Sequence, residues 1–156
     1  MTQRQKMKFP FPHILLMLSC PLWSSGAHAA CSSVDMRGTW AVQALTSVMG
    51  NQLLTCKLEV NQRRGAASVD PSTSCLLKYN QTAQIKNVLG GTVTIEKDCS
   101  FEITVDVDPK GYIILKGDLA RNKQVANAQF NTNQLPENLI NNGYLNYWGI
   151  ASLIKK

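Results

Sequence analysis

Strict alternation of apolar and polar side chains over residues 99–107 constrains the fold of this 156-residue chain more than any other feature. The apolar members occupy every second position: Phe101, Ile103, Val105 and Val107. Successive side chains of a β-strand point to opposite faces of the sheet, so this spacing predicts a strand with one buried and one solvated face. Residues 108–111 (Asp-Pro-Lys-Gly) have the composition of a turn, and residues 112–120 are expected to return as the second strand of a hairpin.

Short strands of this kind recur along the chain without a helical period of comparable length between them. Another strand is expected to begin at Gly38. The remaining expected strands cover residues 54–60, 73–79, 81–88, 92–97, 124–130 and 144–154. We expect a long hairpin loop at 63–72, a turn at 89–91 (Leu-Gly-Gly) and one short helical turn at 135–143. The pattern predicts an all-β fold, an antiparallel meander of eight or nine strands that closes into a small barrel, because closure removes exposed edges.

The first thirty residues have the features of a signal peptide. Residues 1–8 are basic, residues 14–18 are the centre of a short apolar run, and residues 27–29 (Ala-His-Ala) place small residues at the positions that a signal peptidase reads. The apolar run is shorter than the roughly 20 residues that cross a bilayer. We therefore expect residues 1–30 to be removed and residues 31–156 to form one domain without a transmembrane segment. This domain is expected to be exported, in the periplasm or secreted, from a bacterial source.

The basic charge of the chain does not indicate nucleic-acid binding. The sequence has 16 basic and 10 acidic residues and a formal charge of +6. Arg4, Lys6 and Lys8 lie in the expected signal peptide, so the remainder carries a formal charge of only +3. Nucleic-acid-binding domains usually concentrate more positive charge than this. We expect no nucleic-acid partner.

Removal of the signal peptide also removes both histidines, His13 and His28, together with Cys20. The mature chain then lacks the histidine that Ser-His-Asp and Cys-His hydrolases need, and it has no histidine ligand for zinc. We therefore expect no catalytic residue of these classes, no metal and no cofactor.

Carboxylates are the remaining route to catalysis. Four of them are close in sequence: Asp98, Glu102, Asp106 and Asp108. They fall on the polar face of the expected strand or in its flanking turns, where solvated side chains are the ordinary outcome. Glycoside hydrolysis needs one carboxyl with a raised pKa within a cleft, and the sequence does not indicate a cleft here. We expect a protein that is not an enzyme.

Four cysteines remain in the mature chain: Cys31, Cys56, Cys75 and Cys99. An even number in an exported chain predicts two disulfides, whereas the alternative, a metal site of four thiolates, lacks a close C-x-x-C pair. We predict a Cys56–Cys75 bond across the hairpin loop, with Cys31–Cys99 as the remaining pair. Lipidation of Cys31 is a further alternative, disfavoured because it would leave an odd number of thiols.

A Gly-x-Trp sequence, Gly38-Thr39-Trp40, opens the first expected strand. This opening resembles that of the lipocalins and the wider calycin group, which are small exported β-barrels. In that group the tryptophan plugs one end of the barrel, and a basic residue on the last strand packs across it. The resemblance implies a calycin-like barrel with Gly38 and Trp40 as its plug, and Lys155 or Lys156 across the indole ring.

Residues 38–75 are also similar to the bacterial periplasmic inhibitors of serralysin-type metalloproteases. The similarity lies in Gly38-Thr39-Trp40, in residues 56–60 (Cys-Lys-Leu-Glu-Val) and in residues 73–76 (Thr-Ser-Cys-Leu). Those inhibitors are eight-stranded barrels with a disulfide between early strands, and their N-terminal arm enters the protease cleft. The resemblance implies an inhibitory arm formed by Ser32, Ser33, Val34 and Asp35. A cysteine within the arm, Cys31, departs from that pattern and would tether it.

An aromatic cluster, Tyr144, Tyr147 and Trp148, lies in the last expected strand. We interpret it as part of a packed core, because large aromatic side chains usually serve packing. The alternative is that these residues rim a ligand cavity.

The leading functional hypothesis is a non-enzymatic binding module that holds a small apolar ligand inside the barrel. One alternative is a protease inhibitor that acts through its arm or loops, and a third is a secreted or envelope factor without a small ligand. Interior volume discriminates between the first two, since a filled barrel has no room for a ligand. The positions expected to point inward are Leu58, Leu77, Ile95, Ile103 and Ile114.

Overall fold

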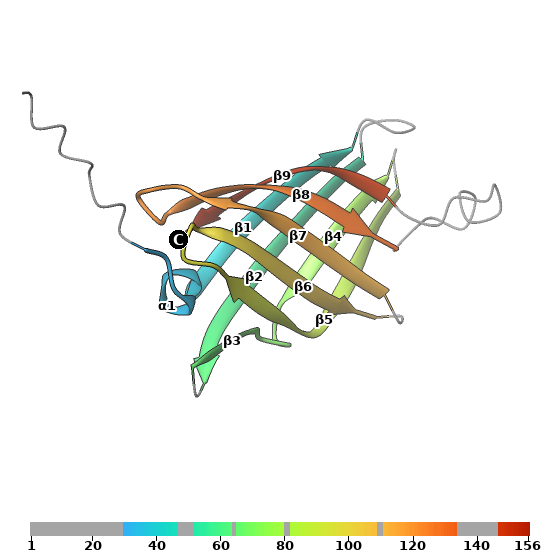
Figure 1. Cartoon of the computed structure of the whole chain (residues 1–156). Helices are drawn as coiled ribbons and strands as arrows, with labels where there is room; N and C mark the ends of the chain where they lie inside the picture. The colour runs from blue at the N-terminus through green and yellow to red at the C-terminus, as the bar shows by residue number, and fades with distance from the viewer. Residues whose placement is uncertain (1–29, 47–51, 64, 80–81, 109–110, 134–146) are drawn as a thin grey trace, which may run out of the picture.

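The expected all-β class is confirmed by a computed structural model of the chain (Figure 1). The structure describes residues 30–46, 52–63, 65–79, 82–108, 111–133 and 147–156. Its elements are α1 (Ser33–Met36), β1 (Gly38–Thr46), β2 (Gln52–Arg63), β3 (Ala66–Val69), β4 (Ser74–Tyr79), β5 (Thr82–Ile95), β6 (Ser100–Val107), β7 (Gly111–Leu119), β8 (Val125–Thr132) and β9 (Tyr147–Lys155). The expected signal peptide and helical turn at 135–143 lie outside the described residues.

Eight antiparallel strands close into a barrel, and β3 is an additional strand. Closure is made by β1, which pairs with β2 on one side and with β9 on the other. Trp40 lies opposite Leu58 of β2 and opposite Lys155 of β9. Every barrel strand therefore has a neighbour on both sides over at least part of its length, and the predicted closure is confirmed.

The expected long loop at 63–72 is wrong, because this segment contains β3. The strand β2 extends to Arg63, and its last residues pair with β3 from Val60↔Val69 to Arg63↔Ala66. The inward residues of β3 are Ala67 and Val69, and both are buried. Two small apolar residues in a short segment produce too weak an alternation to distinguish a strand from a loop. Because β3 also pairs with β5, the sheet is not a pure meander.

The expected turn at residues 89–91 is also wrong, because β5 runs through it as one strand of 14 residues. The pairing register with β6 shifts between Val88 and Gly90, and Gly90 has a φ of +140°. A Cβ atom added to Gly91 would overlap the carbonyl oxygen of Thr104 on β6. The extra residue is Leu89, and the segment therefore forms a β-bulge, followed by the two glycines, that bends the strand instead of reversing it.

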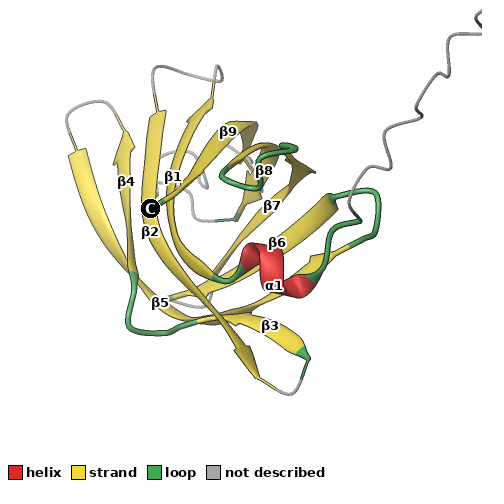
Figure 2. Ribbon diagram, turned by 90° about the vertical axis from the view of Figure 1, so that its left-hand side faces the viewer, coloured by secondary structure: helices red, strands yellow, loops and turns green. Residues whose placement is uncertain are grey.

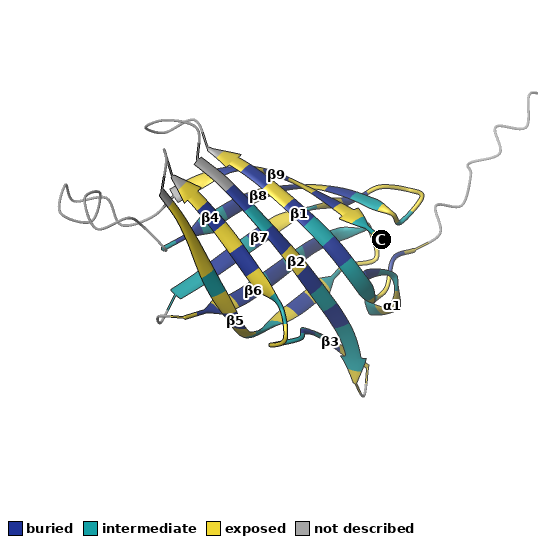
Figure 3. Ribbon diagram, turned by 180° about the vertical axis from the view of Figure 1, so that it is seen from behind, coloured by how far each residue is buried: buried dark blue, intermediate teal, exposed yellow. Residues whose placement is uncertain are grey.

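The core fills the barrel with the inward side chains of its strands, and buried and exposed residues alternate along each strand (Figure 3). The alternation predicted for β6 is confirmed, since its four apolar residues are at most 5% exposed. Leu58, Leu77 and Ile103 are buried as expected, and Ile95 is partly buried. Ile114 is a correction, because its neighbours Ile113 and Leu115 point inward instead.

Two disulfides with the predicted pairing, Cys56–Cys75 and Cys31–Cys99, cross-link the barrel. The first joins directly paired positions of β2 and β4. The second joins the segment before α1 to the turn before β6, where Cys99 has a positive φ of 75°. The two bonds close loops with sequence separations of 19 and 68 residues.

Replacing both cysteines of either disulfide by serine should lower the free energy of unfolding. Loop-closure entropy predicts a loss of about 3 kcal/mol for Cys56→Ser with Cys75→Ser, and about 4 kcal/mol for Cys31→Ser with Cys99→Ser. Denaturant unfolding of the oxidised protein and both variants measures the two losses. Free thiols in the unreduced native protein, detected by mass analysis, would contradict this pairing.

Candidate functional site

The helix α1 covers one end of the barrel (Figure 2). Trp40 is 0% exposed, and its indole N–H donates a hydrogen bond to the carbonyl oxygen of Met36, 2.7 Å away. The Lys155 ammonium lies 5.5 Å from the centre of the Trp40 ring and donates a hydrogen bond of 2.9 Å to the carbonyl oxygen of Asp35. Lys155, and not Lys156, is thus the basic residue across the ring. Gly38 leaves room for this arrangement, since a Cβ there would lie 3.1 Å from Cε of Lys155.

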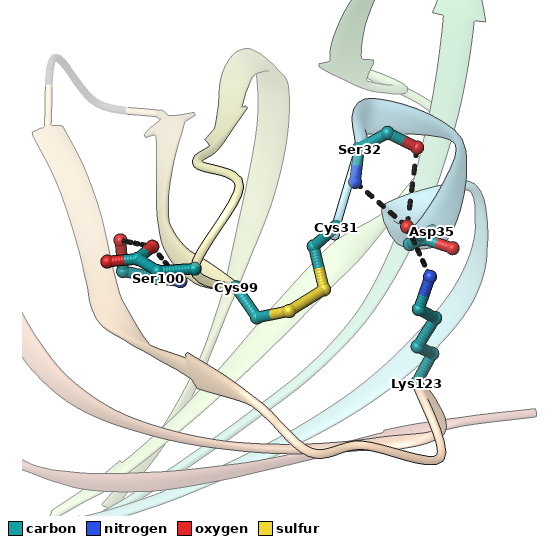
Figure 4. The surroundings of a disulfide bond; sticks show 7 residues. Cys31, Ser32, Asp35, Cys99, Ser100 and Lys123 are labelled. Carbon is teal, nitrogen blue, oxygen red and sulfur yellow. Dashed lines mark hydrogen bonds and ion pairs between the residues drawn. A yellow bond between two sulfur atoms is a disulfide. The ribbon is translucent and has the colours of Figure 1, made fainter. Parts of the chain in front are cut away.

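The segment interpreted as an inhibitory arm is folded against this end of the barrel (Figure 4). The N–H of Ser32 donates to Oδ2 of Asp35 at 2.8 Å, and Nζ of Lys123 lies 2.9 Å from the same oxygen. The hydroxyl of Ser33 donates to the carbonyl oxygen of Gly65 at 3.3 Å. Val34, at 56% exposed, is the large apolar side chain that this segment presents to solvent. The segment is therefore an end cap, and no part of it extends away from the barrel.

The electrostatics of the cap centre on Asp35. Burial by itself raises the pKa of this carboxyl, but the hydrogen bond and charge of Lys123 and the hydrogen bonds from Ser32 outweigh burial. The pKa of Asp35 therefore lies below its ordinary value of 3.8. The charged form of Asp35 is the one that holds the cap.

The interior of the described barrel is filled. The largest side chains that are less than 2% exposed are Trp40, Met36, Leu54, Leu58, Ile103, Leu115, Leu153, Val42, Val60, Val105, Val107 and Thr132. A side chain this inaccessible has almost no water-sized space beside it, inside or outside the barrel. These residues come from six of the eight barrel strands and from α1. On the other two strands, Cys75 and Leu77 of β4 and Val88 of β5 are at most 4% exposed, so packing is continuous across the interior.

A groove of about 670 Å³ lies instead on the outside of the barrel, across β7, β8, β9 and β1. Two rows of outward side chains line it, because the paired positions of adjacent strands point to the same face. The first row is Lys116, Gln129, Ile150 and Leu45, and the second is Asp118, Asn127, Ser152 and Gln43. Gly117, Ala128 and Ala151 lie between the rows and contribute the floor of the groove.

Four large apolar side chains on β9 and β1 are more than half exposed beside or in this groove. They are Leu45 (54%), Trp148 (66%), Ile150 (69%) and Ile154 (54%), and we call them the β9 patch. Leu45 and Ile150 are directly paired across β1 and β9. Strand alternation gathers Trp148, Ile150 and Ile154 on the outer face of β9, since Gly149, Ala151 and Leu153 point inward.

The interpretation of Trp148 as a core residue is therefore wrong. Its neighbour Gly149 occupies the inward position, where a Cβ would overlap the ring of Phe130 and the backbone of Leu45. The strand places Trp148 on the solvent side as a consequence. Tyr147 is the first residue of β9, and Tyr144 lies outside the described residues.

The carboxylates considered as catalytic candidates lie on the outer surface of the described barrel. Glu102 forms an exposed ion pair with Lys116 at 2.8 Å. Asp98 accepts hydrogen bonds from the hydroxyl and N–H of Ser100, which lower the pKa of Asp98, as expected for a residue that stabilises a turn. Asp106 and Asp108 are exposed. No group of three or more potential metal ligands occurs among the described residues.

A search of protein-family models finds no match to this chain, and a search of curated proteins finds none either. The closed barrel is compatible with a calycin-like fold, whereas neither the lipocalin nor the inhibitor resemblance gains support from a related sequence. Two disulfides are typical of an oxidising, exported environment. In the described part of the chain, no helix is long and apolar enough to span a membrane.

Replacing Trp40 by alanine should lower the free energy of unfolding by about 3–5 kcal/mol, because it empties a fully enclosed site and removes the partner of the Met36 carbonyl. Trp148→Ala is the matched control, since the same change at an exposed position should cost less than about 0.5 kcal/mol. Denaturant unfolding measures both. Equal losses in the two variants would contradict the assignment of Trp40 as the plug.

Replacing Asp35 by asparagine should destabilise the protein by about 1 kcal/mol at pH 7, since the pair with Lys123 is mostly shielded from solvent. Because the pKa of Asp35 is lowered on folding, the stabilisation is complete above the ordinary value of 3.8 and is lost as the pH falls through the lowered pKa. The difference in unfolding free energy between wild type and variant should therefore shrink between about pH 5 and pH 2. Asp106→Asn, at an exposed position, serves as control. A pH-independent difference for Asp35→Asn would rule out its charge as the cause.

Proposed function

We propose that this protein is an exported, non-enzymatic binding module that contacts a partner protein through the outer face of β9 and β1. The observation that carries the proposal is the β9 patch, four large apolar side chains left in solvent beside a groove on an otherwise alternating barrel. Apolar side chains of this size are normally buried, and a contiguous exposed group of them is typical of an interaction surface.

The filled interior supports an external site over a ligand cavity. A small apolar ligand inside the barrel needs several hundred cubic ångströms of space, and the central inward side chains leave almost no water-sized space beside them. The hypothesis of a ligand held within the barrel is therefore the less favoured one. The groove outside the barrel, in contrast, has a volume of about 670 Å³.

The composition of the groove favours a protein as its partner. Trp148 and Ile150 are large side chains of the kind that carry most of the binding energy at protein interfaces. Around them, the side chains of Gln43, Asn127 and Gln129 form no hydrogen bond within the described residues, so their amides are available to a partner. An apolar centre with a polar rim is the usual anatomy of such an interface.

A protease remains one candidate for the partner, although the N-terminal segment does not favour inhibition by an arm. The residues from Ser32 to Asp35 are engaged in the end cap, and Cys31 is 5% exposed and bonded to Cys99. Insertion into a protease cleft would require breaking the contacts of Asp35 with Lys123 and Ser32. If the partner is a protease, contact through the β9 patch is favoured because it leaves the contacts of Asp35 intact.

The double variant Trp148→Ser with Ile150→Ser should weaken binding of the partner by at least about tenfold, which corresponds to about 1.4 kcal/mol. A photo-crosslinking residue at Gln129 should capture the partner from the exported fraction of the source cells, and one at Asp106, which is on β6 and does not line the groove, should not. Calorimetric titration of the purified partner then gives the affinities of wild type and variant.

Leu89→Ser is the matched control, because Leu89 is 59% exposed but lies on β5, outside the patch. It should bind as wild type does. Unchanged affinity in the double variant would overturn the proposed surface. A fluorescent apolar probe provides the opposing test, since saturable one-to-one binding that survives the double variant would restore the hypothesis of an internal ligand.

A further inference from the structure

A second hollow, of about 430 Å³, adjoins the groove on the outer face of the barrel. Groove and hollow share Lys116, Gly117 and Asp118 of β7, and the hollow continues across β6 to the end of β5. Its polar lining residues are Thr94, Glu96, Ser100, Glu102, Lys116 and Asp118. We call it the acidic hollow, because its three carboxylates and one ammonium give it a formal charge of −2. Groove and hollow together cross the neighbouring strands from β5 to β9 and β1 (Figure 1).

Two of the three carboxylates in the acidic hollow have no partner among the described residues. Glu102 is paired with Lys116 at 2.8 Å. The side chains of Glu96 and Asp118 form no ion pair or hydrogen bond within the described part of the chain, and both residues are exposed. They flank Ser100, since Asp118 is paired with Ser100 and the N–H of Glu96 donates to the carbonyl oxygen of Ser100 at 2.8 Å. A cation placed over Ser100 would therefore face two carboxylates.

The opposite end of the groove is apolar. Leu45 and Ile150 are paired across β1 and β9, and they are 54% and 69% exposed. Between the two ends, the groove is lined by the amides of Asn127, Gln129 and Gln43. Each amide carries both donors and an acceptor for hydrogen bonds. Along its length, the depression thus changes from negative through polar to apolar.

The width of the groove fits an extended chain better than a helix. Its walls are rows of outward side chains two residues apart along each strand, which corresponds to about 7 Å. A helix with its side chains is about 10 Å across or more, so it would rest on the two rows without entering between them. An extended chain presents backbone N–H and C=O groups to both of its edges. Gln129 on one wall and Asn127 and Gln43 on the other are suited to pair with these groups.

Strand spacing sets the distance between the two ends of the groove. Adjacent strands are about 4.8 Å apart, and β7 and β1 are separated by three such spacings, or about 14 Å. An extended chain rises about 3.3 Å per residue, so four residues cover about 13 Å, and side chains at that spacing point to the same face. An extended segment in the groove therefore reaches both ends with side chains that are four residues apart.

We infer that the groove binds an extended segment of the partner protein in which a basic and an aliphatic side chain are four residues apart. The basic side chain lies over Ser100 between Glu96 and Asp118, and the aliphatic side chain packs on Leu45 and Ile150. This inference rests on the proposed function and adds the chemistry of the segment that is bound. An acidic segment is disfavoured, because it would bring like charges together in the acidic hollow.

Selection of random linear peptides displayed on phage, with the oxidised protein immobilised, tests the chemistry of the segment. Peptides that also bind the double variant Trp148→Ser with Ile150→Ser are discarded, which leaves those that need the β9 patch. The retained sequences should be enriched in Lys or Arg four residues from Leu, Ile or Val. Retained peptides without this spacing, or rich in acidic residues, would overturn the inference and leave the proposed surface intact. A selection that retains no peptide would also overturn it, and cross-linking at Gln129 would still decide the proposed surface.

Charge reversal in the acidic hollow tests where the basic side chain lies. Asp118→Lys should weaken binding of a retained peptide at least about tenfold in calorimetric titration, because an ammonium then meets the basic side chain. Asp106→Lys is the matched control, since it makes the same change in net charge at an exposed position that lines neither the groove nor the acidic hollow. It should bind within about twofold of wild type. Circular dichroism verifies that both variants are folded.

Exchange of charges between peptide and protein makes the test specific to this placement. A peptide in which glutamate replaces the basic residue should bind wild type more weakly than the parent peptide does. It should bind Asp118→Lys more tightly than it binds wild type, because the new ammonium then faces a carboxylate. Equal binding of the glutamate peptide to both proteins would overturn the inference. Unchanged binding of the parent peptide to Asp118→Lys would overturn it as well, whereas loss of binding in Trp148→Ser with Ile150→Ser would still support the proposed surface.

Discussion

Pairing of the first strand with the last is the interaction on which the rest of this structure depends. The strand β1 closes the barrel between β2 and β9. Without the pairing of β1 with β9, each of these two strands would have an open edge. The plug lies at this seam, since Trp40 is opposite Lys155 in the closing pair. Because Lys155 also holds the carbonyl of Asp35, the same closure positions α1, and the Cys31–Cys99 bond ties the cap to the opposite wall.

The parts of the fold that the sequence predicts are those with strong local signals. The alternation in β6 predicts its inward face because every second position is a large apolar residue and the positions between them are polar. In β7, the adjacent residues Ile113 and Ile114 are both apolar and point to opposite faces of the strand, so only pairing with β6 decides which one is buried. A glycine pair such as Gly90-Gly91 has the same composition in a turn and in a bulge, and tertiary pairing makes the difference.

The candidate site was less accessible to prediction. The groove is formed by residues from β1, β7, β8 and β9, which are far apart in the sequence and come together through cross-strand pairing alone. The aromatic character of Trp148 predicts a core position, whereas its exposure depends on Gly149 taking the inward position. The one signal in the sequence is the even spacing of Trp148, Ile150 and Ile154, which places them on the opposite face of the strand from Ala151 and Leu153.

The bulge in β5 divides the strand into two segments with different inward phases. Before it, the even-numbered Val88 points into the barrel, and after it the odd-numbered Val93 does so. The extra residue therefore changes the inward positions from even-numbered residues before the bulge to odd-numbered residues after it. A regular strand of the same length, without the bulge, would turn Ile85 toward the interior and Val88 toward solvent. The bulge thus determines which side chains of the first half of β5 the barrel presents to solvent.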